Sequence, residues 1–328
     1  MKLEEIGFYT LCDKRAEEIS SVSNMKRGEI IITDKCNFNC PYCRGPHPEC
    51  KGEKSLEEVK EIIDLWTNEG LENIRFSGGE PTMHKDLDAM IEYAKSKNVE
   101  HVAISTNGSA DYEVYEDLVK SGVNDFSISL DACCSSFADQ MAGTDAKFDT
   151  IISNIKRLST ITYVTVGMVF TDHNVKDIYN TIKFAHDLGV SDIRIISAAQ
   201  CNSLYVKFTE ALGLLDKDIL DAHPILKYRV NNILNKRNVR GFTKNDTNKC
   251  YLLHDDSMVT GSKHFPCVIY MREGGKAIGK IGKDMRKDRI EFFKNFDTHR
   301  DPICKKNCLD VCIDFNNKCK ELSKIEEN

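Results

Sequence analysis

The sequence has no excess of positive charge, no long apolar run and no internal repeat. Its 45 lysines and arginines are outnumbered by 51 aspartates and glutamates, which gives a net charge of −6. General nucleic-acid-binding proteins are normally basic, so this balance argues against that class. No stretch approaches the roughly 20 apolar residues that cross a bilayer, and the first residues are too acidic and polar for a signal peptide. These absences predict a cytoplasmic protein that binds neither nucleic acid nor membrane.

Fourteen cysteines stand out in an otherwise ordinary composition. The 328 residues are 41% hydrophobic and 29% charged, as in many soluble globular proteins. The cysteines gather near the start of the chain and again toward its end. Because disulfides are rare in a reducing compartment, this clustering predicts metal ligands. The nine histidines show no comparable spacing.

Short apolar runs alternate with amphipathic stretches from residue 29 onward, a pattern typical of parallel strands joined by helices. Ser55 and Glu58 carry the signature of a capping box at one helix start. Strands are expected at 29–33, 73–77, 101–105, 125–130, 163–170 and 191–196, and helices near 56–66, 86–97, 112–121, 148–159 and 175–188, with a long loop after residue 130. Six strands are too few for a complete eight-unit barrel. The sequence therefore predicts an α/β protein with a partial (βα)6 barrel.

The expected organisation has five parts. They are a lead-in at 1–27, the partial barrel at 28–200, connecting helices at 201–245, a small, loop-rich, cysteine-dense domain at 246–320 and a tail at 321–328. The cysteine-dense part has few core-forming residues, so we expect it to need metal to fold.

Cys36, Cys40 and Cys43 form the most informative motif, directly after the first predicted strand. Three thiolates this close in sequence can hold three corners of a 4Fe-4S cluster and leave the fourth iron open to a small molecule. Ferredoxin clusters take four cysteines and zinc ribbons take two pairs. Cys50 is a candidate fourth ligand, although the intervening segment looks too stiff to fold back easily. A structural metal knuckle is the alternative interpretation.

The spacing of these cysteines, with the aromatic Tyr42 just before the third, resembles the radical S-adenosylmethionine (SAM) superfamily. The resemblance implies that the open iron is chelated by SAM and that reduction of the cluster cleaves SAM to a 5′-deoxyadenosyl radical. It also implies the partial-barrel fold. The Gly78-Gly79-Glu80 motif follows the second predicted strand and resembles the family loop that contacts the amino group of SAM.

Further polar residues at strand ends resemble family positions that line the SAM and substrate pocket. With the motif above, the residues for which the resemblance implies cofactor binding are Tyr42, Ser77, Gly78, Gly79, Glu80, Ser105, Asn107, Ser127 and Ser129. The alternatives are that the polar side chains satisfy their own turns and that the tyrosine packs the cysteine loop. Cys133 and Cys134 are expected to be small buried residues.

The C-terminal cysteines form a second group. Cys304, Cys308, Cys312 and Cys319 are closely spaced, and Cys250 and Cys267 flank a glycine in a way that resembles the SPASM and Twitch extensions of radical SAM enzymes. Six cysteines are too few for two four-thiolate sites, so one auxiliary iron–sulfur cluster is expected. Its predicted ligands are Cys267, Cys304, Cys308 or Cys312, and Cys319; zinc is the alternative metal. Cys250 would then be free to donate a hydrogen atom to a substrate radical.

The resemblance implies an enzyme that abstracts hydrogen from a substrate carbon. A loose likeness of the C-terminal third to aminoglycoside epimerases favours epimerisation or oxidation of a carbohydrate-like natural product. Modification of a ribosomally made peptide is the first alternative, and a noncatalytic iron–sulfur or zinc protein is the second. The expected partners are a small-molecule or peptide substrate and a low-potential electron donor such as flavodoxin or ferredoxin.

Overall fold

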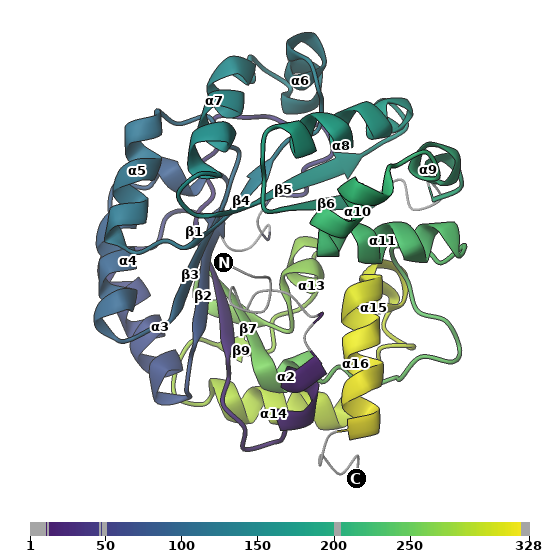
Figure 1. The fold of residues 1–328 in the computed structure, drawn as a ribbon. Coiled ribbons are helices and arrows are strands. Elements are labelled where there is room, and N and C mark those ends of the chain that lie inside the picture. The colour runs from purple at the N-terminus through teal and green to yellow at the C-terminus, as the bar shows by residue number, and fades with distance from the viewer. Residues whose placement is uncertain (1–10, 12, 46, 48–50, 200–204, 323–328) are drawn as a thin grey trace. The chain divides into compact units, whose positions relative to one another are not determined.

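The computed structural model describes residues 11, 13–45, 47, 51–199 and 205–322 (Figure 1). The chain divides into two compact units, each assembled from segments that are separate in the sequence. Apart from Met1, unit 1 contains residues 36–43 and 103–239, and unit 2 contains residues 2–35, 44–102 and 240–328. Cys50, the candidate fourth ligand of the first cluster, lies outside the described residues.

Unit 2 opens with two of the predicted strands. Its first elements are α2 (Asp13–Glu18), β1 (Arg27–Thr33), α3 (Leu56–Asn68), β2 (Asn73–Gly78), the 3-10 turn η1 (Pro81–Met83) and α4 (Leu87–Ser96). The predicted capping box is confirmed, because Ser55 Oγ accepts from the Glu58 N–H at 3.3 Å and Glu58 Oε2 accepts from the Ser55 N–H at 2.7 Å. Trp66 of α3 packs on Gly28 of β1, where a Cβ atom would lie 2.4 Å from the indole ring. This contact fixes α3 against the strand that leads to the cysteine loop.

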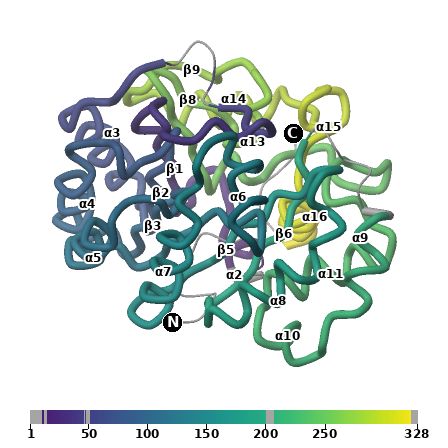
Figure 2. Tube along the Cα trace, turned by 90° about the horizontal axis from the view of Figure 1, so that it is seen from above, coloured from purple at the N-terminus to yellow at the C-terminus, as the bar shows by residue number. Residues whose placement is uncertain are grey.

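The C-terminal third adds three strands that the sequence pattern did not reveal. Its elements are α12 (Leu252–Asp255), β7 (Asp256–Thr260), β8 (Lys263–Phe265), α13 (Val268–Arg272), β9 (Gly279–Lys280), α14 (Met285–Asn295), α15 (Pro302–Asn307) and α16 (Asp310–Leu322). β1 pairs in parallel with β2 on one side and with β7 on the other, so Arg27 aligns with both Asn73 and Asp256. β8 and β9 continue this sheet in antiparallel order. Figure 2 shows α14 beside β8 and β9.

The cysteine-dense region contains more helix and more core than its composition suggested. A buried apolar cluster joins α2, α12, α14 and α16 through Ala16, Ile19, Tyr251, Leu252, Leu253, Phe293, Phe315 and Cys319. Arg15 of α2 lies over the Phe315 ring of α16, 5.0 Å from its centroid. The apolar residues are far apart in sequence, which is why no local periodicity marked them.

Unit 1 contains the remaining parallel strands. Its elements are β3 (His101–Thr106, from residue 103 onward), α5 (Tyr112–Ser121), β4 (Asp125–Ser129), α6 (Ser135–Ala142), α7 (Phe148–Leu158), β5 (Tyr163–Phe170), the 3-10 turn η2 (Val175–Asp177), α8 (Ile178–Asp187), β6 (Asp192–Ser197), α9 (Tyr205–Leu212), α10 (Lys217–Ala222) and α11 (Pro224–Leu234). The strand order is β6-β5-β4-β3, and all pairs are parallel. Figure 1 shows α5, α7 and α8 outside these strands. Phe126, Ile128, Val166 and Met168 are completely buried between the two layers.

The predicted strands and the α/β partial-barrel class are confirmed, with three local differences. The expected loop after residue 130 contains α6, and the helix expected from residue 175 begins with the turn η2. The expectation that Cys133 and Cys134 are buried is wrong, because Cys133 is half-buried and Cys134 is exposed at the start of α6. Both follow β4 at a chain turn, so they do not enter the core. Among the helices of the described residues, none has the length and apolar character of a membrane span.

Candidate functional site

The loop of Cys36, Cys40 and Cys43 belongs to unit 1 and leaves two of its three thiols in contact with solvent. Cys36 and Cys43 are exposed and Cys40 is half-buried. A turn joins the last two, because the Cys43 N–H donates to the Cys40 carbonyl at 2.9 Å. Burial, and next the charge of Asp131, raise the pKa of Cys40 to about 12. A bound cation is what would draw the proton from this thiol.

Backbone and side-chain contacts next to each cysteine hold this loop. The Asn39 N–H donates to the Ala142 carbonyl at 2.8 Å. This close approach requires glycine at residue 143, where φ is +65° and a Cβ atom would lie 2.2 Å from the Asn39 carbonyl oxygen. Tyr42 donates its hydroxyl to Asp131 Oδ2. The loop is therefore attached to the segment that follows β4.

Asp131 is a carboxylate with two partners in unit 1. Its Oδ1 accepts from the Val169 N–H of β5 at 2.6 Å, and its Oδ2 accepts from the Tyr42 hydroxyl. Burial raises the pKa of Asp131 to about 6, and the two hydrogen bonds oppose that rise. Burial also raises the pKa of Tyr42, so its hydroxyl stays protonated as a donor. The structure thus supports the interpretation in which Tyr42 packs the cysteine loop.

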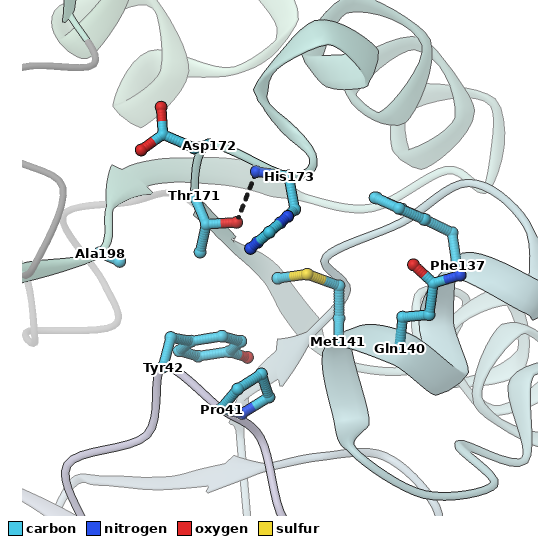
Figure 3. A pocket seen from close by; sticks show the side chains of 9 residues that line it. All are labelled: Pro41, Tyr42, Phe137, Gln140, Met141, Thr171, Asp172, His173 and Ala198. Carbon is cyan, nitrogen blue, oxygen red and sulfur yellow. Dashed lines mark hydrogen bonds between the residues drawn. The ribbon is translucent and has the colours of Figure 1, made fainter.

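A cavity of about 390 Å³ lies beside Tyr42 in unit 1 (Figure 3). The cysteine loop, α6 and the ends of β5 and β6 contribute its lining residues, which are Pro41, Tyr42, Phe137, Gln140, Met141, Thr171, Asp172, His173 and Ala198. A hydrogen bond of 3.1 Å from the His173 N–H to Thr171 Oγ1 shapes the turn after β5. The wall is mostly apolar, and exposed Gln140, Asp172 and His173 supply polar groups. Such a combination is typical of small-molecule sites.

The Gly78-Gly79-Glu80 segment lies in unit 2, where it packs on the end of β1. The N–H groups of Gly79 and Glu80 donate to the carbonyls of Thr33 and Lys35, both at 2.8 Å. A Cβ atom at Gly79 would lie 2.2 Å from the Lys35 carbonyl oxygen, so only glycine fits there. Glu80 is buried, and its carboxylate accepts from the Thr82 hydroxyl at 2.7 Å. These contacts fix the residues immediately before Cys36 in the sequence.

The remaining predicted cofactor residues differ in their surroundings. In unit 2, Ser77 is buried and donates its hydroxyl to Glu29 Oε1 at 2.6 Å. In unit 1, Ser127 is buried and accepts from Arg194 Nη2 at 3.3 Å, while Ser105 is half-buried in β3 and Ser129 is exposed at the end of β4. Ser129 is therefore the most open of the four.

All six C-terminal cysteines of unit 2 lie close enough to affect the ionisation of another, Cys319 through Cys250; the other five form one group. They are Cys250, before α12; Cys267, at the start of α13; Cys304, in α15; Cys308, at its end; and Cys312, in α16. Burial raises the pKa of Cys250 to about 12 and also raises the pKa of Cys267 and Cys304. The Cys308 thiol donates to Cys312, which raises the pKa of Cys308 and lowers that of Cys312.

Cys319 is the most buried of the C-terminal cysteines, and Cys250 and Cys312 pack against the apolar cluster that contains it. Cys319 is completely buried on α16, in the apolar cluster with Tyr251 and Phe315. Burial raises its pKa to about 12, and the Arg15 guanidinium opposes that rise. Cys250, which sequence analysis predicted to be free of the metal site, lies instead among the thiols described above.

Two arginines bring positive charge to the C-terminal thiols, and sequence analysis missed both. Arg289 of α14 is 1% exposed and donates to the carbonyls of Leu253 and Phe265, each at 2.9 Å. Its charge opposes the rise in the pKa of Cys250. Arg27 of β1 donates to Asp256 Oδ2 at 2.6 Å and favours the thiolate of Cys312. No sequence signal marks either arginine, because their partners are distant in the chain.

The donor sets fit iron–sulfur clusters in chemistry. Both are thiols, and the C-terminal set has buried guanidinium groups that balance the negative charge of thiolates. Within the part of the chain that the structure describes, no three His, Cys, Asp or Glu side chains converge as ligands of a single metal ion. A 4Fe-4S cluster binds each cysteine through a different iron, so its ligands need not converge on one point.

Comparison with known proteins agrees with these features. The family model for the radical SAM superfamily matches residues 30–185. A probable GTP 3′,8-cyclase of Methanocaldococcus jannaschii is 29% identical over 184 residues, covering 54% of this chain and 58% of the relative. The GTP 3′,8-cyclase of Pasteurella multocida is 27% identical, with coverages of 53% and 54%. The chain thus spans about half the length of the curated relatives it matches.

Solved structures show the fold more completely. A structure titled anSMEcpe with bound AdoMet has a TM-score of 0.63 and 15% identity, covering 91% of this chain and 93% of that one. Streptococcus suis SuiB bound to its precursor peptide SuiA has a TM-score of 0.57 and 16% identity, covering 89% and 67%. The likeness to both structures shows the fold, and the cysteine-rich C-terminus fits an auxiliary cluster domain.

The family implies two cofactors for the N-terminal motif, a 4Fe-4S cluster and SAM. Cys36, Cys40 and Cys43 lie within the matched segment, and the fold class is that of the family's partial barrel. Residues 30–185 therefore form a radical SAM domain.

Proposed function

We propose that this protein is an enzyme that reductively cleaves SAM and uses the 5′-deoxyadenosyl radical to abstract hydrogen from a substrate carbon. The observation that carries the proposal is the loop in which Cys36 and Cys43 are exposed and Cys40 is half-buried. When bound there, a 4Fe-4S cluster supplies the electron that splits SAM. The chain's own task is to hold the three thiols, orient cofactor and substrate, and exclude water.

We propose that residues of unit 1 bind SAM. Tyr42 and the cavity beside it offer an apolar wall of a size suited to a ring system. Exposed Ser129 and half-buried Ser105 are candidates for polar contacts. For Gly79 and Glu80 of unit 2 the support is the family resemblance, since their N–H groups already donate to the carbonyls of Thr33 and Lys35.

We propose that the auxiliary cluster is held in residues 246–320 by Cys250, Cys267, Cys304 and one of Cys308 and Cys312. The mutual effects of these thiols on one another's ionisation support this set. Cys250 and Cys312 pack against the same apolar cluster as Cys319, but Cys319 alone of the six is completely buried, which supports a packing role for it. Cys250 is then a ligand and not the hydrogen donor that the spacing suggested.

The proposed substrate is a small molecule that contains a sugar. The curated relatives are named GTP 3′,8-cyclases, and the 3′ position of GTP is a ribose carbon. The cavity beside Tyr42 is enclosed enough for a small molecule. Epimerisation or oxidation of a carbohydrate-like natural product is our first choice of outcome, and modification of a peptide is the second. Flavodoxin or ferredoxin is the proposed electron donor.

Anaerobic reconstitution with iron, sulfide, SAM and dithionite tests the proposal. We expect 5′-deoxyadenosine from the wild type and about background levels from Cys40→Ala. Cys134→Ala is the matched control, because Cys134 is an exposed thiol of the same unit. A wild type that binds iron but forms no 5′-deoxyadenosine, with GTP, sugars or peptides present, would favour a noncatalytic iron–sulfur protein.

The two roles for Cys250 predict different results for Cys250→Ala. If Cys250 is a ligand, Cys250→Ala loses the auxiliary iron. If Cys250 is the hydrogen donor, the variant keeps its iron and cleaves SAM but does not form the epimer. Cys319→Ala provides the comparison, since we expect it to keep the iron.

A further inference from the structure

Three side chains next to Cys36 form a closed ring of hydrogen bonds within unit 1. Asn37 Nδ2 donates to Ser109 Oγ at 2.8 Å, Ser109 Oγ donates to Asn107 Oδ1 at 2.7 Å, and Asn107 Nδ2 donates to Asn37 Oδ1 at 2.8 Å. Within the ring each side chain gives one hydrogen bond and receives one, and Asn107 Oδ1 also accepts from the Ser109 N–H at 3.0 Å. The ring links the residue after Cys36 to the turn that follows β3.

The turn that carries this ring is itself firmly held. Asn107 and Ser109 are buried, at 9% and 2% exposed. Gly108 between them has φ of +79°, and its N–H donates to Thr106 Oγ1 at 3.1 Å. Asn154 of α7 donates to the carbonyls of residues 108 and 110, both at 2.8 Å. Because this turn is fixed by buried hydrogen bonds, it can act as a rigid base for an exposed loop.

We propose that Asn107 and Ser109 are positioning residues that hold Asn37, and through it Cys36, in the orientation that binds the catalytic cluster. The Asn107 amide thereby binds the cysteine loop through Asn37. The family resemblance had implied that it binds a sugar hydroxyl of SAM. This inference rests on the proposed function, since it concerns the same loop.

The ring supplies the side-chain attachment next to Cys36, whose Sγ also accepts from the Phe38 N–H at 3.4 Å. Cys40 has the Asn39 backbone contact beside it, and Cys43 has the Tyr42 hydroxyl contact beside it. The side chain of exposed Asn37 is the corresponding attachment next to Cys36. Opening the ring should therefore release the first thiol of the loop while the other two keep their attachments.

A double-mutant cycle of Asn37→Ala and Asn107→Ala tests the ring. We expect each single variant to lose iron from the N-terminal cluster to a chelator about tenfold faster, the size of roughly one buried hydrogen bond, and the double variant to be no faster than either. Ser109→Ala should behave like the single variants. The cluster content is measured in a Cys250→Ala background, where we expect the auxiliary cluster to be missing. Asn73→Ala is the matched control, because Asn73 is a buried asparagine on β2 in unit 2.

Two further readouts separate positioning from SAM binding. In the apo protein, hydrogen exchange at residues 36–38 should speed up about tenfold in Asn107→Ala, while α5 stays unchanged. In the reconstituted enzyme, the KM for SAM should stay within about twofold, while the electron paramagnetic resonance spectrum of the reduced, SAM-free cluster changes.

The opposite pattern would overturn the inference. If Asn107 contacts SAM, Asn107→Ala raises the KM for SAM, leaves iron release and the SAM-free spectrum unchanged, and adds independently to Asn37→Ala. If Asn107→Ala fails to fold, Asn37→Ala and Ser109→Ala still test the ring. A wild type that cleaves no SAM, with the iron-release cycle as expected, would reject the proposed function and leave the positioning role standing.

Discussion

The contact between Tyr42 and Asp131 gives a quantitative prediction about the cysteine loop. Tyr42→Phe removes the hydroxyl that donates to the Asp131 carboxylate. The carboxylate then keeps one hydrogen bond, from the Val169 N–H at 2.6 Å. A hydrogen bond to a charged group contributes about 1.5–3 kcal/mol to stability. Because one donor remains, we expect a loss near the lower end, about 2 kcal/mol. The measurement is urea unfolding of the apo protein at pH 8.

The loss should depend on pH in a defined direction. Burial raises the pKa of Asp131 to about 6, so its carboxylate is charged at pH 8 and mostly protonated at pH 5. The Tyr42 hydroxyl favours the charged form, so Tyr42→Phe raises the pKa of Asp131 further. The destabilisation is therefore complete above that pKa and falls to about 1 kcal/mol, the value for a neutral pair, at pH 5.

Tyr93→Phe is the control for this prediction. The Tyr93 hydroxyl bonds both oxygens of Asp64 at 2.9 Å, but the Asp64 side chain is 45% exposed. Removing a hydroxyl at such a site should change stability by no more than about 0.5 kcal/mol. Equal losses in the two variants, or no loss in Tyr42→Phe at pH 8, would refute the argument that burial makes the Tyr42 contact strong.

Three other variants follow from the structure. Burial lowers the pKa of His254 from 6.5 to about 3. The unfolded chain therefore binds a proton at this residue that the folded chain does not, and stability decreases as the pH falls below 6.5. In urea titrations, His254→Phe should remove about 2 kcal/mol of this destabilisation between pH 8 and pH 5. Gly143→Ala should displace Asn39 and lower the amount of bound iron. Gly189 has φ of +78° and nothing within 4 Å of an added Cβ atom, so Gly189→Ala should strain only its own turn. The iron content per chain of the two variants is the measurement that compares them. Arg289→Met should lose auxiliary iron more readily than Arg289→Lys, as iron analysis and the cluster's midpoint potential would report, and equal retention would argue against a charge effect.

The parallel strands and their helices could be predicted because their signals are local. Apolar runs and helical spacing lie within single segments, and the helix at Tyr112–Ser121 begins and ends where the pattern placed it. β7 could not be found in this way. It is a short strand, Asp256–Thr260, with polar residues at both ends, and its partner β1 lies more than two hundred residues earlier. Its place next to β1 is decided by tertiary packing.

The residue types of the candidate site were visible in the sequence, but their partners were not. Asn107 was recognised as a polar residue at a strand end, yet its contact with Asn37 joins segments that are far apart in the chain. The same holds for Cys250 and Cys319. Spacing favoured Cys319 as a ligand and left Cys250 free, whereas packing buries Cys319 completely and leaves Cys250 half-buried among the other thiols.

The two cysteine groups differ in the way that their proposed roles require. Cys36 and Cys43 are exposed, so a small molecule can reach a cluster held there. Cys250 and Cys267 are half-buried, their pKa values are raised by burial, and buried Arg289 holds the carbonyls of segments next to both. A hydrogen donor must approach the substrate radical directly. A thiol confined among other thiols and a guanidinium group lacks that freedom, so the structure favours cluster binding over hydrogen donation for Cys250.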